Sequence, residues 1–205
     1  MFSNILYILA MTTPYYYNSC IHNMGNVGPM GVLHAALAPA FTKVIDKKAY
    51  NGRNIRKEVY NSIESKSIVD LCCGVGYSTK PGMIGIDTST EMLRFANFYN
   101  PGRQYLFGNA EDVGKDNQFD VVTCMFAFHE MPNNGHHKII DNAIRISTKQ
   151  VIIVDISTNY KPSKLMLGGE PYILNYMETI DGLLENFNKT ILIDNHVDCW
   201  TFNHN

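Results

Sequence analysis

The stretch from Lys66 to Leu93, Lys-Ser-Ile-Val-Asp-Leu-Cys-Cys-Gly-Val-Gly-Tyr-Ser-Thr-Lys-Pro-Gly-Met-Ile-Gly-Ile-Asp-Thr-Ser-Thr-Glu-Met-Leu, carries the strongest structural signal in the chain. Its apolar run at 68–71 is too short for a helix and is flanked by polar residues, which indicates a buried parallel strand. The turn Gly74-Val75-Gly76 follows, and a second short strand at 83–86 ends in Asp87. Parallel strands bring their carboxyl ends to one edge of a sheet, where ligands bind. We therefore expect the glycine turn and Asp87 to face one pocket.

The glycine turn and the acid together indicate a nucleoside-containing ligand. Glycine lets the backbone turn tightly and lets a ligand approach main-chain N–H groups without a Cβ in the way. Asp87 can accept hydrogen bonds from two ribose hydroxyls. The fingerprint of nicotinamide dinucleotide sites needs a third glycine three residues on and an acid about 20 residues further along. This chain has Thr79 at the third position and its acid comes early, which disfavours a nicotinamide-dependent oxidoreductase.

Four segments resemble the motifs of a known family. Residues 70–76, Asp-Leu-Cys-Cys-Gly-Val-Gly, resemble the first motif of class I S-adenosylmethionine-dependent methyltransferases, with Cys72 where that motif usually has its first glycine. Residues 85–89 resemble the acid of the family's second strand and the helix start after it. Residues 108–111 resemble the loop that reads adenine, and residues 119–129 resemble the fourth strand and the lip beside the methyl group. The segments occur in the family's order, which makes the resemblance specific.

The resemblance implies S-adenosylmethionine as the cofactor. It places Asp70, Cys72, Gly74 and Gly76 at the methionine end of the cofactor and Asp87 at the ribose. It places Thr88 and Met92 at the flanks of the adenosine, Asn109 and Ala110 at the adenine edge, and Met125 near the sulfonium. It also implies an α/β, Rossmann-like fold with a seven-stranded, mostly parallel sheet that ends in a C-terminal antiparallel hairpin.

Composition is that of an ordinary globular protein. Hydrophobic residues make up 45% and charged residues 18% of the 205 residues, which suits one domain. A net charge of −2 provides no general affinity for nucleic acid or for anionic lipid. The cysteines are odd in number, five, which suits reduced thiols in the cytoplasm. Adjacent cysteines at 72 and 73 do not have the spacing of zinc ligands, so we expect no metal site.

The first part of the chain is expected to form a helical cap, residues 1–60, on a Rossmann-like core, residues 61–205. Residues 1–11 are apolar but far shorter than the roughly 20 residues of a membrane-spanning helix. Apolar residues at helical spacing predict a helix over 30–47, kinked or divided at Pro39. Asn54 is a suitable cap for a second helix.

Helices and strands alternate through the rest of the chain. Thr88 with Glu91 fits a capping box for a helix that ends near Asn100. The sequence predicts strands at 105–107, 121–124 and 151–154, helices at 133–147 and from Glu170 onward, and a hairpin at 190–193 and 197–202. Only ten residues separate Gly76 from Asp87, so a helix between the first two strands can hardly exceed one turn.

His129 is the best candidate for a catalytic base. Methyl transfer from a sulfonium depends mainly on proximity and orientation. A base is needed only where the acceptor must lose a proton. His129 follows the fourth strand at the carboxyl edge, and the ordinary pKa of histidine lies near working pH. The alternative is a histidine that caps or hydrogen-bonds the following turn. Glu130 is expected to face solvent or the next helix.

Candidate substrate-binding residues are His22, Tyr17, Glu170 and Tyr172. Aromatic packing, a polar turn and helix capping explain them equally well without a function. Residues 169–172, Gly-Glu-Pro-Tyr, and 34–39, His-Ala-Ala-Leu-Ala-Pro, resemble small algal-type methyltransferase-domain proteins, a resemblance that implies no substrate.

The basic residues of the cap are Lys43, Lys47, Lys48, Arg53, Arg56 and Lys57. Acids interrupt the run and aromatic interleaving is thin, so a solvated helix surface is favoured over a nucleic-acid-binding surface.

We therefore expect a methyltransferase that acts on a small molecule, without nucleic-acid or membrane partners and with its oligomeric state open. A non-catalytic binding or regulatory protein that keeps the fold is the alternative. The short crossover and Cys72 motivate that alternative.

Overall fold

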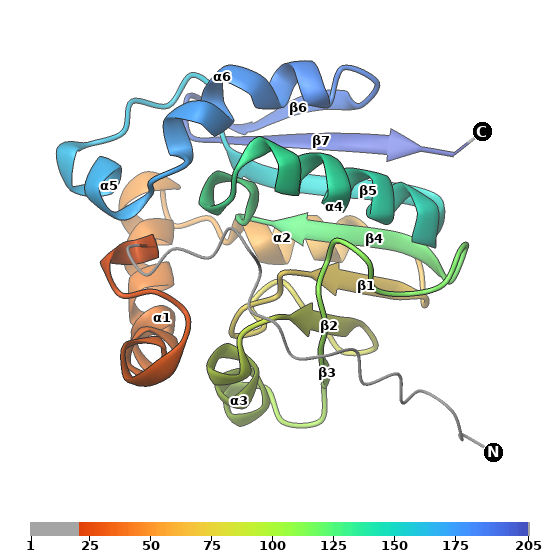
Figure 1. Cartoon of the computed structure of the whole chain (residues 1–205), viewed down its shortest axis with the longest axis horizontal. Coiled ribbons are helices and arrows are strands. Elements are labelled where there is room, and N and C mark those ends of the chain that lie inside the picture. Colours follow the sequence, from red (N-terminus) through yellow and green to blue (C-terminus); the bar gives the residue numbers. More distant parts are fainter. Residues whose placement is uncertain (1–20, 205) are drawn as a thin grey trace.

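The computed structural model describes residues 21–204. Their strands form a seven-stranded sheet in the order β3-β2-β1-β4-β5-β7-β6 (Figure 1). The strands are β1 (Ile68–Leu71), β2 (Ile84–Asp87), β3 (Gln104–Phe107), β4 (Phe119–Met125), β5 (Ser147–Ile156), β6 (Asn188–Ile193) and β7 (Val197–Asn203). β1 to β5 run parallel, and β7 is antiparallel to both β5 and β6. The expected Rossmann-like sheet with a C-terminal antiparallel hairpin is confirmed.

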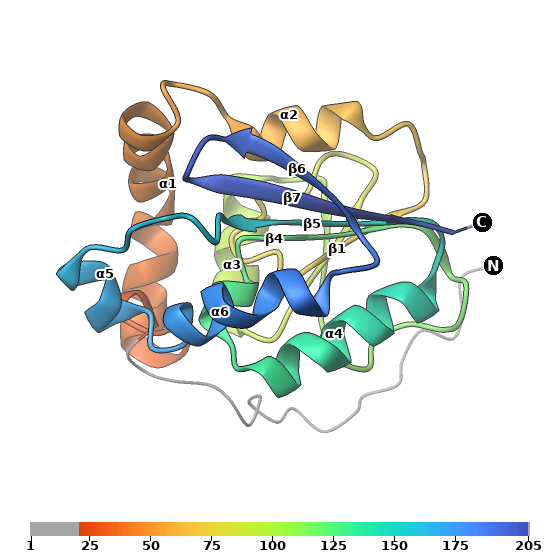
Figure 2. The same ribbon diagram turned by 90° about the horizontal axis from the view of Figure 1, so that it is seen from above.

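Helices cover both faces of the sheet. They are α1 (Gly28–Ala49), α2 (Ile55–Ser62), α3 (Thr90–Tyr99), α4 (Asn133–Ile146), α5 (Lys164–Gly169) and α6 (Ile173–Leu183), with short 3-10 turns η1 (Ile21–Asn23) and η2 (Phe128–Glu130). α4 and α6 lie on one face and α2 on the other (Figure 2). Figure 1 shows α1 standing across the end of the sheet toward which the parallel strands point. Among residues 21–204, none of the helices has both the length and the apolar character needed to cross a bilayer.

The main core lies between the sheet and helices α4 and α6. Ile139 and Ile146 of α4 and Ile180 of α6 are fully buried there. The facing strands β4 and β5 are central, and most of their residues are buried, including the apolar run at 151–154. Burying each such side chain contributes about 1.5–3 kcal/mol. This core holds the carboxyl ends of the central strands in fixed positions.

No helix forms between β1 and β2, in agreement with the short spacing. A buried carboxylate organises this crossover instead. Asp70, at the end of β1, is fully buried and accepts hydrogen bonds from the hydroxyls of Ser78 at 2.8 Å, Thr79 at 2.7 Å and Thr123 at 2.8 Å. A buried carboxylate is tolerated where donors satisfy it. The loop that carries the glycine turn is therefore folded around one side chain.

Two helix starts differ from the expectation. The N-cap of α3 is Ser89, whose Oγ accepts a hydrogen bond from the Met92 N–H at 3.1 Å, so the capping box of Thr88 and Glu91 is wrong. Glu91 instead accepts the N–H of Gly28 at 2.7 Å, at the start of α1. The helix expected to begin at Glu170 begins at Ile173, and α5 precedes it. Local pattern did not choose between Thr88 and Ser89 as the cap, since both are suitable residue types, and Glu91 is engaged by a residue 63 positions away.

Helix α1 continues through Pro39 as one element, without the division considered above. Proline removes only its own backbone donor, and the neighbouring turns keep theirs.

Gly76 cannot be replaced without loss of stability. A Cβ at this position would lie 2.1 Å from the Tyr105 hydroxyl oxygen, and the backbone φ is +82°. We expect Gly76→Ala to lower the free energy of unfolding by about 2–5 kcal/mol, because overlap adds to backbone strain. Gly82→Ala is the matched control, since φ is +91° there and no atom lies within 4 Å of the added Cβ. Urea unfolding of both variants checks this, and equal losses would show that the overlap with Tyr105 is unimportant.

Candidate active site

A cavity of about 740 Å³ lies at the carboxyl edge of the parallel strands. Small-molecule sites typically measure about 300–1,000 Å³. Its core side is formed by the loop after β1, the end of β2 and the loops after β3 and β4, and its other side is formed by α1. The place where the sheet was expected to bind a ligand is therefore a real, covered cavity.

The turn after β1 presents its backbone to this cavity. Cys72, Gly74 and Gly76 all have left-handed backbone conformations, with φ of 55°, 53° and 82°. No atom lies within 4 Å of a Cβ added to Gly74, so this residue faces open space. Left-handed φ at Cys72 explains why glycine is favoured at that position, although cysteine occupies it here.

Asp87 joins the two strand ends that form the cavity floor. One carboxylate oxygen accepts the Gly74 N–H at 2.8 Å, and the other accepts the Ser89 N–H at 2.8 Å. Burial raises the pKa of Asp87 to about 6, against the opposing effect of these two hydrogen bonds. Each oxygen has further lone-pair capacity, which suits a pair of hydroxyl donors from a ligand.

Most of the residues that the motifs assigned to the cofactor line the cavity. They are Cys72, Gly74, Asp87, Thr88, Met92, Asn109, Ala110 and Met125. Asp70 and Gly76 are not among the lining residues, because Asp70 is buried beneath the turn and Gly76 packs against Tyr105. These two residues shape the turn that the others present.

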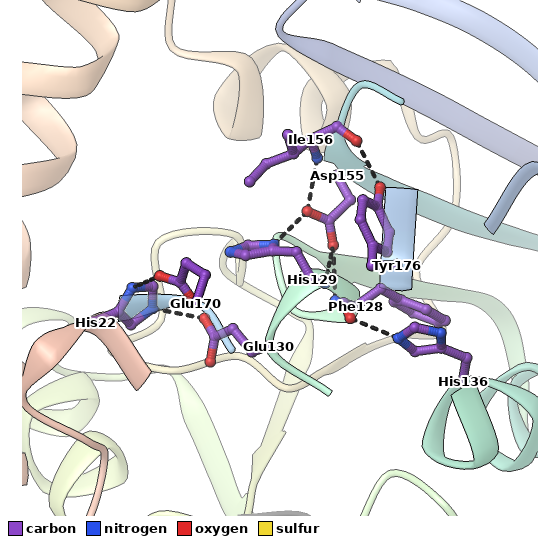
Figure 3. Close-up of polar contacts among 9 residues, drawn as sticks. All are labelled: His22, Phe128, His129, Glu130, His136, Asp155, Ile156, Glu170 and Tyr176. Atoms are coloured by element: carbon purple, nitrogen blue, oxygen red, sulfur yellow. Dashed lines mark hydrogen bonds and ion pairs between the residues drawn. The ribbon is translucent and has the colours of Figure 1, made fainter. Parts of the chain in front are cut away.

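His129 and Asp155 form a buried pair beside the cavity (Figure 3). The Nδ1 atom of His129 lies 2.6 Å from Asp155, whose carboxylate also accepts the N–H groups of Phe128 and Ile156, each at 2.7 Å. Burial lowers the pKa of His129, but the charge of Asp155 and the hydrogen bond to it raise that pKa to about 9. His129 lines the cavity, and within the described residues its Nε2 makes no hydrogen bond. The ring is therefore oriented by Asp155 with Nε2 left for a ligand.

His22 bridges two carboxylates, as Figure 3 shows, and it lines the cavity together with both of them. Its Nε2 lies 2.7 Å from Glu130 and its Nδ1 lies 2.6 Å from Glu170. Burial lowers the pKa of His22, but the two carboxylates raise it well above its ordinary value. Burial raises the pKa of Glu130, and the charge of His22 lowers it to about 2. Glu130 was expected to face solvent or the next helix; that was wrong, because η2 turns its side chain toward the cap.

Further contacts hold α1 in place over the cavity. His34 lies 3.0 Å from the carbonyl oxygen of Gly25, and the Ser89 hydroxyl donates to the carbonyl of Asn26. A Cβ on Gly169 would lie 2.4 Å from the Asn23 side chain, so α5 packs closely on η1. The first segment of the described chain is thus attached to both α3 and α5.

The substrate candidates have different positions. His22 and Glu170 line the cavity, whereas Tyr172 is not among its lining residues. Tyr17 lies outside the described residues, as do residues 1–11.

Sequence reasoning missed four residues beside the cavity: Tyr50, Arg56, Phe126 and Asp155. All but Asp155 line it. Arg56 was expected on a solvated surface; that was wrong, because it lies between the buried residues Ile55 and Val59 of α2 and points to the cavity. The amphipathic pattern of α2 was the available signal for Arg56. For Asp155 it was an acid at the end of the fifth strand.

The residues present fit the adenosyl cofactor that the motifs imply. Gly74 leaves space for close approach to the backbone, and Asp87 has acceptor capacity for a ribose. Thr88, Met92 and Asn109 line the adjoining part of the cavity, which offers both apolar contact and polar groups to a purine.

Comparisons with known proteins bear on the fold and on the kind of domain. Residues 68–150 match the family model described as a methyltransferase domain. A comparison with curated proteins gave no match. Among solved structures, the PH0226 protein from Pyrococcus horikoshii is similar at 16% identity and a TM-score of 0.58, over 78% of this chain and 93% of that chain.

Two more solved structures have the same fold. A SAM-dependent methyltransferase from Aquifex aeolicus is 15% identical with a TM-score of 0.56, over 80% of this chain and 96% of that one. Magnesium protoporphyrin IX methyltransferase from Synechocystis, solved with bound SAM, is 13% identical with a TM-score of 0.50, over 85% of this chain and 80% of that one. The fold, the ordered motifs and the family model agree: residues 68–150 are similar to a methyltransferase domain, and the described chain has the fold of class I S-adenosylmethionine-dependent methyltransferases.

Proposed function

We propose that this methyltransferase acts on a small-molecule acceptor and that His129 serves as its base. One observation supports this most: a single cavity joins Gly74 and Asp87 to the His129–Asp155 pair. When bound, S-adenosylmethionine supplies a methyl group already activated by the sulfonium charge. The protein then has to position the two reactants, which is worth up to about 7–11 kcal/mol.

Each part of the cavity has a role in that positioning. Asp87 accepts hydrogen bonds from the ribose, and the backbone at Gly74 borders the methionine end. Helix α1 and the His22 bridge exclude water from the reacting groups. Of the cap proposed for residues 1–60, the described part, from residue 21 onward, covers the cavity, and the proposed core, residues 61–205, follows it in one methyltransferase domain.

His129 is arranged to accept a proton at Nε2. Asp155 holds Nδ1 and stabilises the imidazolium that results. Because the pKa of His129 is about 9, the neutral form is a minority at neutral pH. The pKa falls when a cation is bound beside the ring, which increases the neutral fraction.

The covered cavity favours a small acceptor over a macromolecule. Magnesium protoporphyrin IX methyltransferase, which has a similar fold, is named for a small-molecule substrate. A reducing compartment such as the cytoplasm is supported by the free thiols of Cys72, Cys73, Cys124 and Cys199.

Two measurements test the proposal. Calorimetry with S-adenosylhomocysteine should give a micromolar dissociation constant, and incubation with methyl-labelled cofactor and a small-molecule extract should give a labelled product. Absence of binding at high micromolar ligand would contradict the cofactor site. Binding without any labelled small molecule would favour the non-catalytic alternative.

Binding of S-adenosylhomocysteine should depend on pH through Asp87. The pKa of Asp87 is about 6, so the carboxylate is ionised above pH 6 and gains a proton below it. A protonated carboxyl is a weaker acceptor for the ribose hydroxyls. We expect affinity to be constant from pH 7 to 8 and to fall about tenfold by pH 5, measured by calorimetry. An affinity that is unchanged at pH 5 would contradict the role of Asp87.

A further inference from the structure

Arg56 packs against aromatic side chains that line the cavity. Its guanidinium carbon lies 4.0 Å from the centre of the Phe126 ring, and Tyr50 stacks on the same ring at 6.3 Å between centroids and 22° between planes. All three residues line the cavity. Phe126 directly follows β4, and Arg56 is the second residue of α2, so the cluster lies where the cap meets the carboxyl edge.

The guanidinium of Arg56 forms no ion pair with a carboxylate of the described chain, although Asp46, Asp155 and Asp70 lie near enough to attract it. Within residues 21–204 it makes no hydrogen bond and no ion pair, only the contact with Phe126. Arg53, one turn earlier, is exposed and lies 2.6 Å from Glu58. Burial lowers the pKa of Arg56, although arginine stays charged in proteins. A partly buried charge without a counter-ion is costly, so such groups are usually paired, and the side of Arg56 that faces the cavity is where a counter-ion can lie.

The carboxylates near Arg56 do not supply the missing counter-ion. The oxygens of Asp70 are occupied by three hydroxyls, and those of Asp155 by His129 and backbone N–H groups. Asp46 is the remaining neighbour: its Oδ1 is buried without a hydrogen-bond partner, yet no ion pair joins it to Arg56 within the described chain. The donors of Arg56 are thus left for the cavity.

The surroundings define the group that would fit. A guanidinium offers paired N–H donors that match the two oxygens of a carboxylate. The wall around it is apolar and aromatic, with Phe41, Val44 and Ile45 of α1 added to Tyr50 and Phe126. One positive charge in such a wall suits one negative charge, and the low polarity strengthens the pairing.

We propose that Arg56 binds the carboxylate of a small molecule held in the cavity. The inference rests on the proposed function, which supplies two sources of that carboxylate: the amino-acid end of the cofactor, and an acid group on an apolar acceptor. Both would meet the guanidinium with the same chemistry, so the experiment has one arm for each.

The cofactor arm compares S-adenosylhomocysteine with its decarboxylated analogue, which keeps the amine. If the cofactor is the source, Arg56→Gln weakens S-adenosylhomocysteine binding about 10–100-fold in calorimetry, as expected for a lost hydrogen bond to a charged group, and leaves the analogue unchanged. Arg53→Gln, which removes an exposed charge three residues away, leaves both unchanged.

The acceptor arm compares benzoate with benzamide, which differ in charge and hardly in shape. Both are titrated by ligand-observed NMR into the free protein and into protein saturated with S-adenosylhomocysteine. If the acceptor is the source, wild type prefers benzoate about tenfold or more, and Arg56→Gln abolishes this preference while S-adenosylhomocysteine binds normally. Arg56→Lys, which keeps the charge without the paired donors, retains part of the effect in either arm.

The outcomes are separable from those of the proposed function. Binding of S-adenosylhomocysteine to the wild type tests the proposed function. The preference for the carboxylate member of each ligand pair tests Arg56, and for benzoate and benzamide this preference is also measured without S-adenosylhomocysteine. The inference is overturned if Arg56→Gln changes neither preference, or weakens both members of a pair equally. Equal weakening, with a lower free energy of unfolding that Asp46→Asn reproduces, would assign Arg56 a purely structural pairing with Asp46.

Discussion

Asp87→Ala should weaken the binding of S-adenosylhomocysteine by at least about 100-fold. The variant removes the acceptor proposed for the ribose, and hydrogen bonds to a charged group contribute about 1.5–3 kcal/mol each. It also removes the oxygens that accept the Gly74 and Ser89 N–H groups at 2.8 Å, so the turn loses its link to β2. Both losses act on the same site, which is why this effect should be among the largest of any single substitution. Calorimetry at pH 7.5 measures it.

Two variants make the result interpretable. Asp141→Ala removes an exposed acid on α4, far along the chain from the turn, and should leave affinity unchanged. Asp87→Asn keeps the size of the side chain but presents an amide N–H where a backbone N–H now donates, so most of the affinity should be lost. A native circular dichroism spectrum shows that the variants are folded. An affinity within threefold of wild type for folded Asp87→Ala would remove the basis of the assigned cofactor site.

His129→Ala should lower kcat about 10²–10⁴-fold for an acceptor that must lose a proton, with little change in the binding of S-adenosylhomocysteine. The reason is that Nε2 of His129 faces the cavity, whereas Nδ1 is held by Asp155 at 2.6 Å. The rate of the wild type should rise with pH and level off above the pKa of His129. In the variant the rate should continue to rise with pH, because only ionisation of the acceptor itself then removes the proton.

Asp155→Asn separates a base from a merely structural histidine. Without the carboxylate the pKa of His129 should fall from about 9 toward its ordinary value, so the rising limb of the pH–rate profile should move to lower pH. His137→Ala, which removes an exposed histidine of α4, should change neither kcat nor the profile. If His129→Ala retained wild-type kcat and its pH dependence, the ring would be a hydrogen-bonding element of η2 and not a base.

Short-range pattern was sufficient for the architecture. Strands β1, β4 and β5 contain short apolar runs that are buried on both faces, and such runs between helices have few alternatives to a parallel sheet. The short spacing between Gly76 and Asp87 correctly excluded a long crossover helix, because helices need more residues than this segment contains. The glycine turn and Asp87 were placed together by the same logic, since parallel strands end at one edge.

Local pattern failed where a side chain acts on a distant segment. Glu130 follows a strand and precedes a helix, a position that usually faces water, yet His22 binds it across 108 residues of sequence. Glu91 fits a capping box, but it accepts the N–H of Gly28 in another helix. In each case a charge or donor from the cap was available only after folding.

The functional residues also divide into those whose positions the sequence predicted and those whose positions only the tertiary structure decided. Residue order alone predicts a nucleoside site, because glycine conformation and strand direction are local properties and parallel strands end at one edge of the sheet. The position of α1 over that edge, the pairing of His129 with Asp155 and the exposure of the Arg56 guanidinium to the cavity depend on packing between segments far apart in the chain. Contacts between segments far apart in the chain produce no periodic pattern in the sequence, so only the tertiary structure shows them.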